Sequence, residues 1–496
     1  MDMKPTSTFD KDAPLQPIPQ SAVSEPVATL SAPRPLLTAV ILLGSDMLAL
    51  TLAAFIGALG WNSLNNLVNP GLFLQLWPLL AVFPLGYFMM GLYPAAGVNP
   101  VDELKRLTSV TTGVYWMVVL VLFLSKDWLI ASRGIYLSSW LLALLFVPLG
   151  RAALRHFLSS RDWWGVPVIV LGTGKTGLLL IDRLKSNPGL GLKVLAGLDD
   201  DPSKHGQFKG VELTGPLSKA TTYAKDKGIR HALVAMPGLA PLQLSRLTRR
   251  YANIFPHLIL VPDMFGMASL GVDTMDFAGI VGLHARQNLL LRRNQIAKRW
   301  IDLLILLPAS TIALPIIVLA ALWIQFVAKG SPFYTQLREG YKGKEIKVWK
   351  LRTMYLNADE LLETHLNENP EARKEWESFY KLKNDPRIFP GAGLLRKLSI
   401  DELPQLFNVA KGEMSFIGPR PFPYYHLESF NEAFRDLRVE AKPGITGLWQ
   451  VSARSDGDLL IQEELDSYYI RNWSPWLDLY ILARTPWSVL FSKGAY

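Results

Sequence analysis

The 496-residue chain contains no cysteine and only seven histidines. The absence of cysteine excludes disulfide bonds, thiolate nucleophiles, and zinc or iron–sulfur sites built on cysteine. The histidines are scattered and form no pair at the helical spacing of a metal site. Charged residues make up only 19% of the chain and hydrophobic residues 50%, which excludes a single soluble domain of ordinary composition. We therefore expect several modules, some of them in a membrane.

The net charge of +9 is concentrated in one part of the chain. Residues 286–352 hold twelve Lys and Arg against three Asp and Glu, and these charges surround a long apolar run. A basic belt around an apolar segment suits an anionic lipid surface or a phosphate-bearing substrate. The chain has no nucleic-acid recognition motif, so we expect no nucleic-acid partner.

An N-terminal tail, residues 1–35, is rich in Pro, Ser, Ala and Thr and is predicted to be disordered. Residues 36–150 are predicted to form four transmembrane helices, from apolar runs at Leu36–Leu59, Phe73–Tyr93, Leu107–Leu124 and Gly134–Gly150. Basic residues follow the second and fourth runs, so the positive-inside rule puts both ends of this bundle in the cytoplasm. Asp46 lies within the first run, where a charge can be functional; we favour the alternative that it is paired inside the bundle.

Residues 151–285 resemble half of a Rossmann fold and are predicted to form a cytoplasmic α/β domain. An expected strand at 166–171 leads into a glycine-rich loop, and expected strands at 192–198 and 232–236 follow. The loop glycines, Gly172, Gly174 and Gly177, are candidate ligand residues because glycines let the backbone approach a pyrophosphate at a helix N-terminus. The alternative, which we favour, is that they serve only a tight turn and close helix packing.

Residues 303–327 form a run of 25 residues without a charge, long enough to cross a ~30 Å hydrocarbon core as a straight helix. Lys and Arg flank it on both sides, so the positive-inside rule asks for both ends in the cytoplasm. Pro308 and Pro315 lie inside the run and favour a kink. We therefore predict a re-entrant helix at 301–328 that bends at Leu314 and Pro315 and returns to the same side. The alternative is an ordinary span kinked at proline.

The last 200 residues, approximately, carry a series of short motifs: Lys329–Tyr334, Lys347–Met354, Asp385–Ile388, Leu395–Leu406, Gly418–Pro421 and Lys442–Val451. In this order they resemble the catalytic domain of the polyprenyl-phosphate glycosyl-1-phosphate transferases, the bacterial sugar transferases that begin surface-glycan assembly. The spans and the half-Rossmann segment resemble the large, multi-domain branch of that family. One departure is that the family commonly has Ser-Pro at the bend of the re-entrant helix, where this chain has Leu314-Pro315.

This resemblance implies an α-rich, monotopic catalytic domain over residues 286–496, with interfacial helices, on the cytoplasmic face of a bacterial inner membrane. It implies transfer of a hexose-1-phosphate, expected to be galactose-1-phosphate, from a UDP-sugar to undecaprenyl phosphate, with release of UMP. Asp401 is then the nucleophile that forms a covalent phosphosugar intermediate, and Glu402 helps to bind Mg²⁺. Membrane lipids and a second copy in a homodimer are the further expected partners, and O-antigen, capsule or exopolysaccharide assembly is the expected pathway.

The residue types around Asp401 suit phosphate chemistry on their own account. In a chain without cysteine, a carboxylate is the natural covalent nucleophile. Arg396 and Arg420 are candidate phosphate clamps, because the guanidinium fork matches phosphate oxygens. Lys350 and Arg352 are two residues apart, would share one face of a strand, and are candidates for the same anionic pocket. The alternative for each is a solvated charge or a lipid-headgroup contact.

Several alternatives remain open at this stage. Ser399-Ile400-Asp401-Glu402 also matches a capping box, so these acids alone would indicate a helix N-terminus. The loop 442–450 either contacts the nucleotide or sugar or forms a rigid turn. Residues 474–480 open a helix with Ser474 as N-cap, which lies at the membrane interface or packs in the core. Rival functions are a membrane-anchored nucleotide or metabolite sensor built on the half-Rossmann domain, and a membrane-bound NAD-dependent sugar-nucleotide oxidoreductase.

Overall fold

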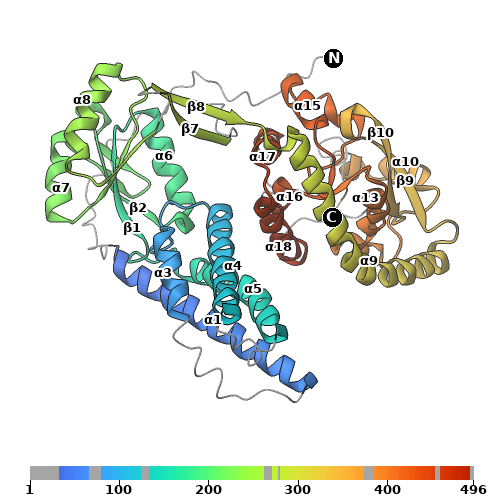
Figure 1. Cartoon of the computed structure of the whole chain (residues 1–496). Coiled ribbons are helices and arrows are strands. Elements are labelled where there is room, and N and C mark those ends of the chain that lie inside the picture. Colours follow the sequence, from blue (N-terminus) through green and yellow to red (C-terminus); the bar gives the residue numbers. More distant parts are fainter. Residues whose placement is uncertain are drawn as a thin grey trace. The chain divides into compact units, whose positions relative to one another are not determined.

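The computed structural model describes residues 33–65, 80–124, 133–261, 271–277, 280–373, 382, 385–452 and 459–491. The chain divides into two compact units, Met1–Asp263 and Met264–Tyr496, whose elements are labelled in Figure 1. Most of the predicted disordered tail and part of the second apolar run lie outside the described residues. The sequence put the border before the catalytic domain after residue 285, whereas the units part at Asp263, so the hairpin of β7 (Gly271–Phe277) and β8 (Ile280–Arg286) groups with the second unit.

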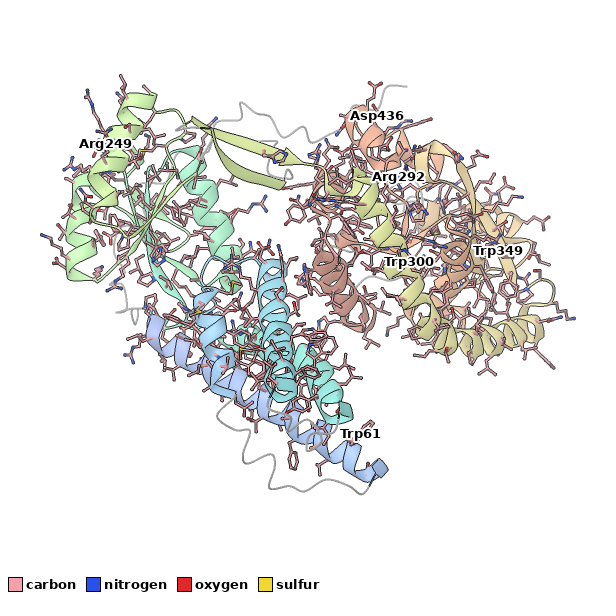
Figure 2. The ribbon with its side chains drawn as sticks, viewed as in Figure 1. Trp61, Arg249, Arg292, Trp300, Trp349 and Asp436 are labelled. Atoms are coloured by element: carbon pink, nitrogen blue, oxygen red, sulfur yellow. The ribbon has the colours of Figure 1, made fainter. Side chains whose placement is uncertain are left out.

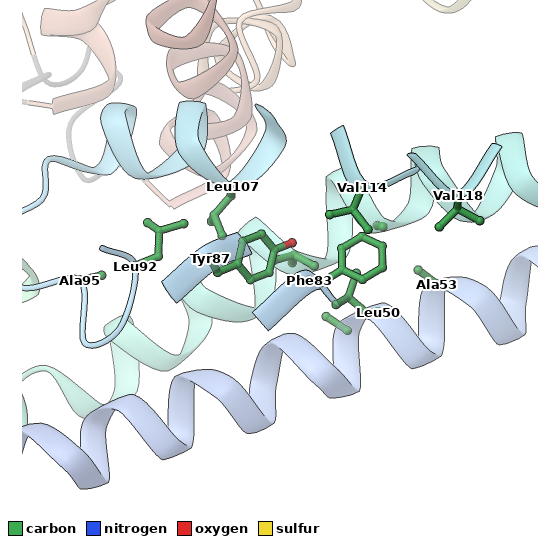
Figure 3. Packing of buried hydrophobic residues seen from close by; sticks show 12 residues of the cluster. Leu50, Ala53, Phe83, Tyr87, Leu92, Ala95, Leu107, Val114 and Val118 are labelled. Atoms are coloured by element: carbon green, nitrogen blue, oxygen red, sulfur yellow. The ribbon is translucent and has the colours of Figure 1, made fainter. Parts of the chain in front are cut away.

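The first unit begins with an apolar helical bundle. It comprises α1 (Pro35–Asn65), α3 (Val82–Met89), α4 (Pro100–Leu124) and α5 (Arg133–Leu158). Figure 3 shows their shared core, in which Leu50, Phe83, Tyr87 and Leu107 are almost completely buried. Large apolar side chains also cover the outer faces, where Phe55 of α1 and Leu145 of α5 are more than half exposed. Apolar side chains on both the inner and the outer faces are typical of helices surrounded by lipid.

Three helices in the described part of the chain are long and apolar enough to cross a membrane. They are Pro35–Trp61, Gly134–Leu158 and Arg292–Ala328. The first two match the first and fourth predicted runs. The helix α4, in the third predicted run, is not among the three, and α3, in the second, has only eight residues. The third is the helix for which the sequence predicted a re-entrant course.

Asp46 is paired inside the bundle. Its carboxylate accepts hydrogen bonds from Arg151 Nε at 2.9 Å and Nη2 at 2.6 Å, and from the Tyr93 hydroxyl at 2.6 Å. Arg151 also donates to Glu103 Oε1 at 2.9 Å, and Arg155 lies 3.0 Å from the other oxygen of Glu103. All these charges are compensated, which a buried charge requires. The expectation that Asp46 pairs within the bundle is confirmed.

The α/β part of the first unit is built on one six-stranded sheet with the order β3-β4-β2-β1-β5-β6. Its parallel strands alternate with helices, and only β3 runs antiparallel to its neighbour. The expected strands 166–171 and 192–198 are β1 and β2 with the predicted bounds, and the third is β5. The bounds are β1 (Val166–Leu171), α6 (Lys175–Ser186), β2 (Leu192–Leu198), β3 (Gly206–Phe208), β4 (Val211–Leu213), α7 (Ala220–Asp226), β5 (His231–Val234), α8 (Pro241–Ala252) and β6 (His257–Leu260).

The second unit contains one long helix, short strands and many short helices. After α9 (Arg292–Ala328) comes an antiparallel hairpin, and a second, parallel strand pair joins β11 to β12. The bounds are β9 (Phe333–Glu339), β10 (Glu345–Leu351), α10 (Ala358–Glu368), α12 (Ala392–Lys397), the 3₁₀ helix η8 (Ile400–Gln405), α13 (Leu406–Lys411), β11 (Ser415–Ile417), α14 (Tyr424–Leu427), α15 (Glu432–Val439), β12 (Gly444–Thr446), α16 (Leu448–Ser452), α17 (Leu459–Asn472) and α18 (Pro475–Phe491).

The helix α9 is continuous over 37 residues, contains Pro308 and Pro315, and bends in Figure 1. Near its beginning, Arg299 donates to the carbonyl oxygens of Val409 and Ala410. Near its end, the Trp323 ring lies 5.8 Å from that of Phe389. Both ends of α9 therefore pack on the same folded unit.

The C-terminal helix α18 begins as the sequence predicts. The Ser474 hydroxyl accepts a hydrogen bond from Leu477 N at 3.2 Å, and Pro475 is the first helical residue. Trp473 just before it is buried and donates to Asp478 at 3.0 Å, whereas Trp487 is 63% exposed. One end of this segment therefore packs in the core, and the other presents an aromatic side chain outward.

Candidate active site

The strand β10 is fixed by a buried asparagine. Asn408 of α13 is fully buried, accepts a hydrogen bond from Trp349 N at 3.1 Å and donates to the Lys347 carbonyl at 2.8 Å. An amide can bond to a strand in this way because it carries both a donor and an acceptor. Figure 2 labels Trp349 on this strand. These two hydrogen bonds fix the backbone of β10 next to Lys350, whose side chain contacts Glu402 of the 3₁₀ helix η8.

Asp401 and Glu402 lie in the first turn of η8. The preceding residue Ser399 has a left-handed backbone with φ of 54°, and its side chain makes no cap hydrogen bond. The capping-box interpretation of these residues is therefore wrong, because a capping serine requires an extended backbone and a hydroxyl bonded to the helix. In a 3₁₀ helix successive side chains are about 120° apart, so the two carboxylates point in different directions.

Two cations hold Glu402. Lys350 Nζ lies 2.9 Å from Glu402 Oε1, and Arg420 Nη2 lies 3.3 Å from the same oxygen. Lys350 and Glu402 are each about 15% exposed, so the pair is accessible from one side. The structure thus brings together three of the predicted residues from β10, η8 and the loop after β11.

Asp401 lies in the same electrostatic environment. Burial raises the pKa of its carboxyl group, and the negative charge of Glu402 raises it further, while Lys350 and Arg396 lower it, with a net pKa of about 6. A carboxylate with this pKa is ionised at neutral pH yet is more basic than an exposed aspartate. Such a raised pKa in a cluster of opposite charges is typical of a functional site.

Arg396, in the last turn of α12, lies near two carboxylates. Its charge lowers the pKa of Asp401 and also that of Asp385. Burial by itself raises the pKa of Asp385, but hydrogen bonds and charge from Arg387 bring it below its ordinary value. Arg387 Nη2 lies 2.6 Å from Asp385, and this ion pair forms the turn that leads into α12. The sequence singled out the Asp385 motif but assigned it no role.

Tyr334 is a site residue that the sequence analysis missed. It pairs with Lys350 across the β9–β10 hairpin, so the two side chains lie on one face. Burial raises the pKa of its hydroxyl, and Lys350, Asp401, Arg396 and Glu402 all act on it electrostatically. The signal was present in the motif Lys329–Tyr334, which ends at this tyrosine.

Arg352 directly follows the last residue of β10 and meets a different element. Its backbone N donates to the Pro332 carbonyl, and its Nη2 donates to Lys329 O at 2.5 Å and approaches Ala328 O at 3.4 Å. Ala328 is the last residue of α9 and Lys329 is its C-cap, so the guanidinium caps that helix. A phosphate contact of Arg352 stays a prediction. Leu314 and Pro315 both lie within the bent helix α9, and the position of the bend at these two residues also stays a prediction.

The glycine loop of the α/β domain is tightly packed at two of its three positions. Gly172 has φ of 95°, and a Cβ there would lie 2.3 Å from Met236 Cγ. A Cβ on Gly177 would lie 2.0 Å from the Gly172 carbonyl oxygen, whereas Gly174 has nothing within 4 Å. Asp199 after β2 accepts a hydrogen bond from Thr173 N at 2.9 Å. This geometry supports the interpretation that the glycines serve a turn and close packing.

The loop 442–450 packs against the loop that carries Arg420. A Cβ on Gly444 would lie 2.1 Å from Gly418 N, and a Cβ on Gly447 would lie 2.4 Å from Gly418 O. These contacts favour the rigid turn over a free substrate loop. Within the described residues, no group of three or more His, Asp or Glu side chains is arranged to hold a metal ion.

Comparison with known proteins defines the class. Residues 293–492, which include Asp401 and the charged residues around it, match the family described as bacterial sugar transferase. Residues 89–262 match a family described as CoA-binding domain. The chain belongs to the bacterial sugar transferase family and is an enzyme.

Similar proteins share most of the chain. The UDP-galactose-lipid carrier transferase of Erwinia amylovora is 34% identical over 428 residues, which cover 84% of this chain and 87% of that protein. The undecaprenyl-phosphate galactose phosphotransferase of Salmonella typhimurium is 33% identical, with the same coverage of 84% and 87%. The UDP-glucose:undecaprenyl-phosphate glucose-1-phosphate transferase of Escherichia coli is 30% identical and covers 66% of this chain and 68% of that protein. The first two similarities extend well beyond the catalytic region into the first unit.

Proposed function

We propose that this enzyme transfers a hexose-1-phosphate from a UDP-sugar to undecaprenyl phosphate through a phosphosugar intermediate on Asp401. The names of the relatives from Erwinia and Salmonella support a UDP-galactose donor and a lipid carrier. The observation that carries the proposal is the placement of Asp401 beside Glu402, Lys350 and Arg396, with a pKa near 6. A nucleophile surrounded by fixed cations suits attack on a charged diphosphate.

The proposed reaction has two steps. The Asp401 carboxylate oxygen attacks the phosphorus bonded to the sugar, the bond from that phosphorus to the bridging oxygen breaks, and UMP leaves. An oxygen of the lipid phosphate then attacks the same phosphorus, the bond to Asp401 breaks, and the carboxylate is regenerated. Arg396 and Arg420 would balance charge on the phosphate oxygens in both steps.

The residues present fit a magnesium ion that arrives with the diphosphate. Mg²⁺ in such sites is held by one or two carboxylates together with substrate phosphates and water, rather than by a full set of protein ligands. Glu402 is the carboxylate available for that role, and the described residues offer no larger acidic cluster nearby. When bound, the ion would neutralise diphosphate charge.

The experiment uses the full chain in detergent, Mg²⁺ and a panel of UDP-sugars, with and without undecaprenyl phosphate. UMP release and, without acceptor, transfer of sugar-linked ³²P to the protein are measured. With UDP-galactose, we expect the parent enzyme to show UMP release and labelling of the protein, and we expect Asp401→Asn to show neither. The control Asp436→Asn, on the exposed face of α15, should show UMP release and labelling. If no UDP-sugar releases UMP, the transferase proposal fails. If UDP-glucose is the only donor used, the reaction class stands and the sugar is corrected.

The proposal includes α9 as a re-entrant anchor in the cytoplasmic face of the inner membrane. Asp302 accepts hydrogen bonds from Ser415 and Phe416, and Trp323, 21 residues later, packs near Phe389 of the same unit. A straight helix would carry these residues about 31 Å apart, roughly the thickness of the hydrocarbon core. A span that left the unit on one side of the membrane could not contact it at both positions, so these contacts support a monotopic helix.

Single cysteines in this cysteine-free chain test the topology. Cells carrying Lys344→Cys or Ser63→Cys are treated with a membrane-impermeant thiol reagent. We expect Ser63→Cys, at the outer end of α1, to react in intact cells and Lys344→Cys to react only after lysis. Labelling of Lys344→Cys in intact cells would overturn the re-entrant course. The homodimer and a role in the first membrane step of O-antigen, capsule or exopolysaccharide assembly belong to the same proposal.

A further inference from the structure

The loop that carries Arg420 is fixed on one side by backbone contacts. Gly418 N donates to Thr446 O at 2.9 Å, and Gly444 N donates to Pro419 O at 2.9 Å. The glycines allow this approach, because a Cβ on either Gly418 or Gly444 would lie within 2.5 Å of backbone atoms of the other segment. The loop therefore cannot move toward β12 without a clash.

On its other side the loop is held by Arg438 of α15, which is only 4% exposed. Arg438 Nη2 donates a short hydrogen bond to the carbonyl oxygen of Arg420. Its Nη1 lies 3.4 Å from Glu339 Oε2, and its Cζ lies 4.8 Å from the ring centroid of Phe422. A buried guanidinium held by a carboxylate, an aromatic ring and a carbonyl oxygen has little freedom to move.

A second carboxyl group faces the same guanidinium. Asp466 of α17 is 2% exposed, and its Oδ2 has no hydrogen-bond partner. Burial raises the pKa of Asp466 to about 7, and the charge of Arg438 opposes this rise. Glu339 therefore supplies the hydrogen-bonded counter-charge of Arg438, and Asp466 adds a buried carboxyl group beside it, while the other terminal nitrogen of Arg438 binds the backbone of the loop that carries Arg420.

The two groups of Arg420 have different partners. Its side chain reaches Glu402 at 3.3 Å, and its carbonyl oxygen is bound by Arg438. The direction of a side chain follows from the placement of its own backbone, so release of the carbonyl would also release the guanidinium. A displacement of about 1 Å in a catalytic group can cost about 100-fold in rate.

We propose that Arg438 is a positioning residue for the transfer reaction: by binding the carbonyl oxygen of Arg420, it keeps the Arg420 guanidinium facing Glu402 and the reacting phosphate. This inference rests on the proposed function and adds to it a residue that touches neither Asp401 nor Glu402 through any described hydrogen bond.

The test is a double-mutant cycle in the full chain, with initial rates of UMP release from a UDP-sugar. Arg438→Met is expected to lower kcat/KM by about 10- to 100-fold. The loss should be divided between kcat and KM in the same proportion as the loss caused by Arg420→Met. In the Arg420→Met background, Arg438→Met should change kcat/KM by less than about threefold, because the group it positions is gone. Arg438→Lys, which keeps one donor for the carbonyl, should recover part of the rate. The control is Arg435→Met, an exposed arginine on the same helix, which should leave the rate unchanged.

Fully additive losses in the double variant, or wild-type kcat/KM in Arg438→Met, would overturn the inference. If Arg438→Met does not fold, the cycle is run with Arg438→Lys, which lacks the guanidinium fork. Arg438→Lys must then lower the rate when Arg420 is present and must leave the rate unchanged when it is combined with Arg420→Met. Failure of the proposed function is a different result, because the parent enzyme would then release no UMP from any UDP-sugar.

Discussion

The ionisation of Asp401 sets the low-pH limit of the proposed reaction. Burial and Glu402 raise its pKa to about 6, and Lys350 and Arg396 oppose that rise. In the proposed reaction the nucleophile is the deprotonated carboxylate, so protonation of Asp401 would remove it. We expect kcat/KM, which reports the free enzyme, to be constant above this pKa and to fall about tenfold for each pH unit below it.

Two substitutions should move this limit in opposite directions. Glu402→Gln removes a negative neighbour, so the Asp401 pKa falls and the acid limb moves to lower pH. Lys350→Met removes a positive neighbour, so the limb moves to higher pH. Each shift should be about one pH unit, because a charge within a few ångströms has an effect of that size. The ion pair of Lys350 and Glu402 at 2.9 Å reinforces both shifts, since loss of one partner leaves the charge of the other uncompensated beside Asp401.

The assay is UMP release at low UDP-sugar concentration and constant ionic strength, from about pH 5 to about pH 8. Lower absolute rates in both variants do not matter, because the position of the limb is read from the shape of the profile. Glu432→Gln, at an exposed position of α15, is the control and should leave the limb in place. The assignment of Asp401 would be refuted if the acid limb of the pH profile moved in the same direction in the two variants. It would also be refuted if the acid limb of the parent enzyme lay near pH 4.

Other predictions follow from single contacts. Arg151→Met should lower the stability of the detergent-solubilised protein by about 3–5 kcal/mol, because Asp46 and Glu103 lose their counter-charge; an unchanged melting temperature would contradict this. Gly444→Ala should lower kcat/KM, since its Cβ would lie 2.1 Å from Gly418 N, whereas Gly393→Ala, with nothing within 4 Å, should not. Asn408→Ala should cost about 1–3 kcal/mol for each buried backbone group of β10 that it leaves unpaired, measured by thermal unfolding with Asn357→Ala as control.

Elements with a strong local signal were predicted from the sequence. The strand β1 is a continuous apolar run, β2 is apolar apart from Lys193, and they are followed by Gly172 and Asp199, so their bounds follow from the residues themselves. The start of α18 was also local, because serine followed by proline specifies an N-cap and a first turn. Lys350 and Glu402 were found because short motifs named them, although their contact was not predicted.

Features that depend on distant partners were not available from the sequence. Arg151 and Asp46 are 105 positions apart, and only the packing of α1 against α5 brings them together. Arg438 and Asn408 had no pattern of their own, since a buried arginine or asparagine is recognised only by what it contacts. The capping box failed for a backbone reason: Ser399 adopts a left-handed conformation, so its hydroxyl does not cap the turn that carries Asp401.

The contacts of Lys350 and Arg352 relate the candidate active site to the end of the apolar helix α9. The sequence assigned both to one strand face and one anionic pocket, but Arg352 follows the last residue of β10, and Lys350 meets Glu402 whereas Arg352 meets the carbonyl oxygens at the end of α9. The helix α9 ends at Ala328, and the charged Lys329 that follows it is the kind of residue found where an apolar helix reaches lipid headgroups. Under the proposed re-entrant course of α9, Lys350 and the Glu402 that it binds would therefore lie close to the headgroup level, where the phosphate of the proposed lipid acceptor would be.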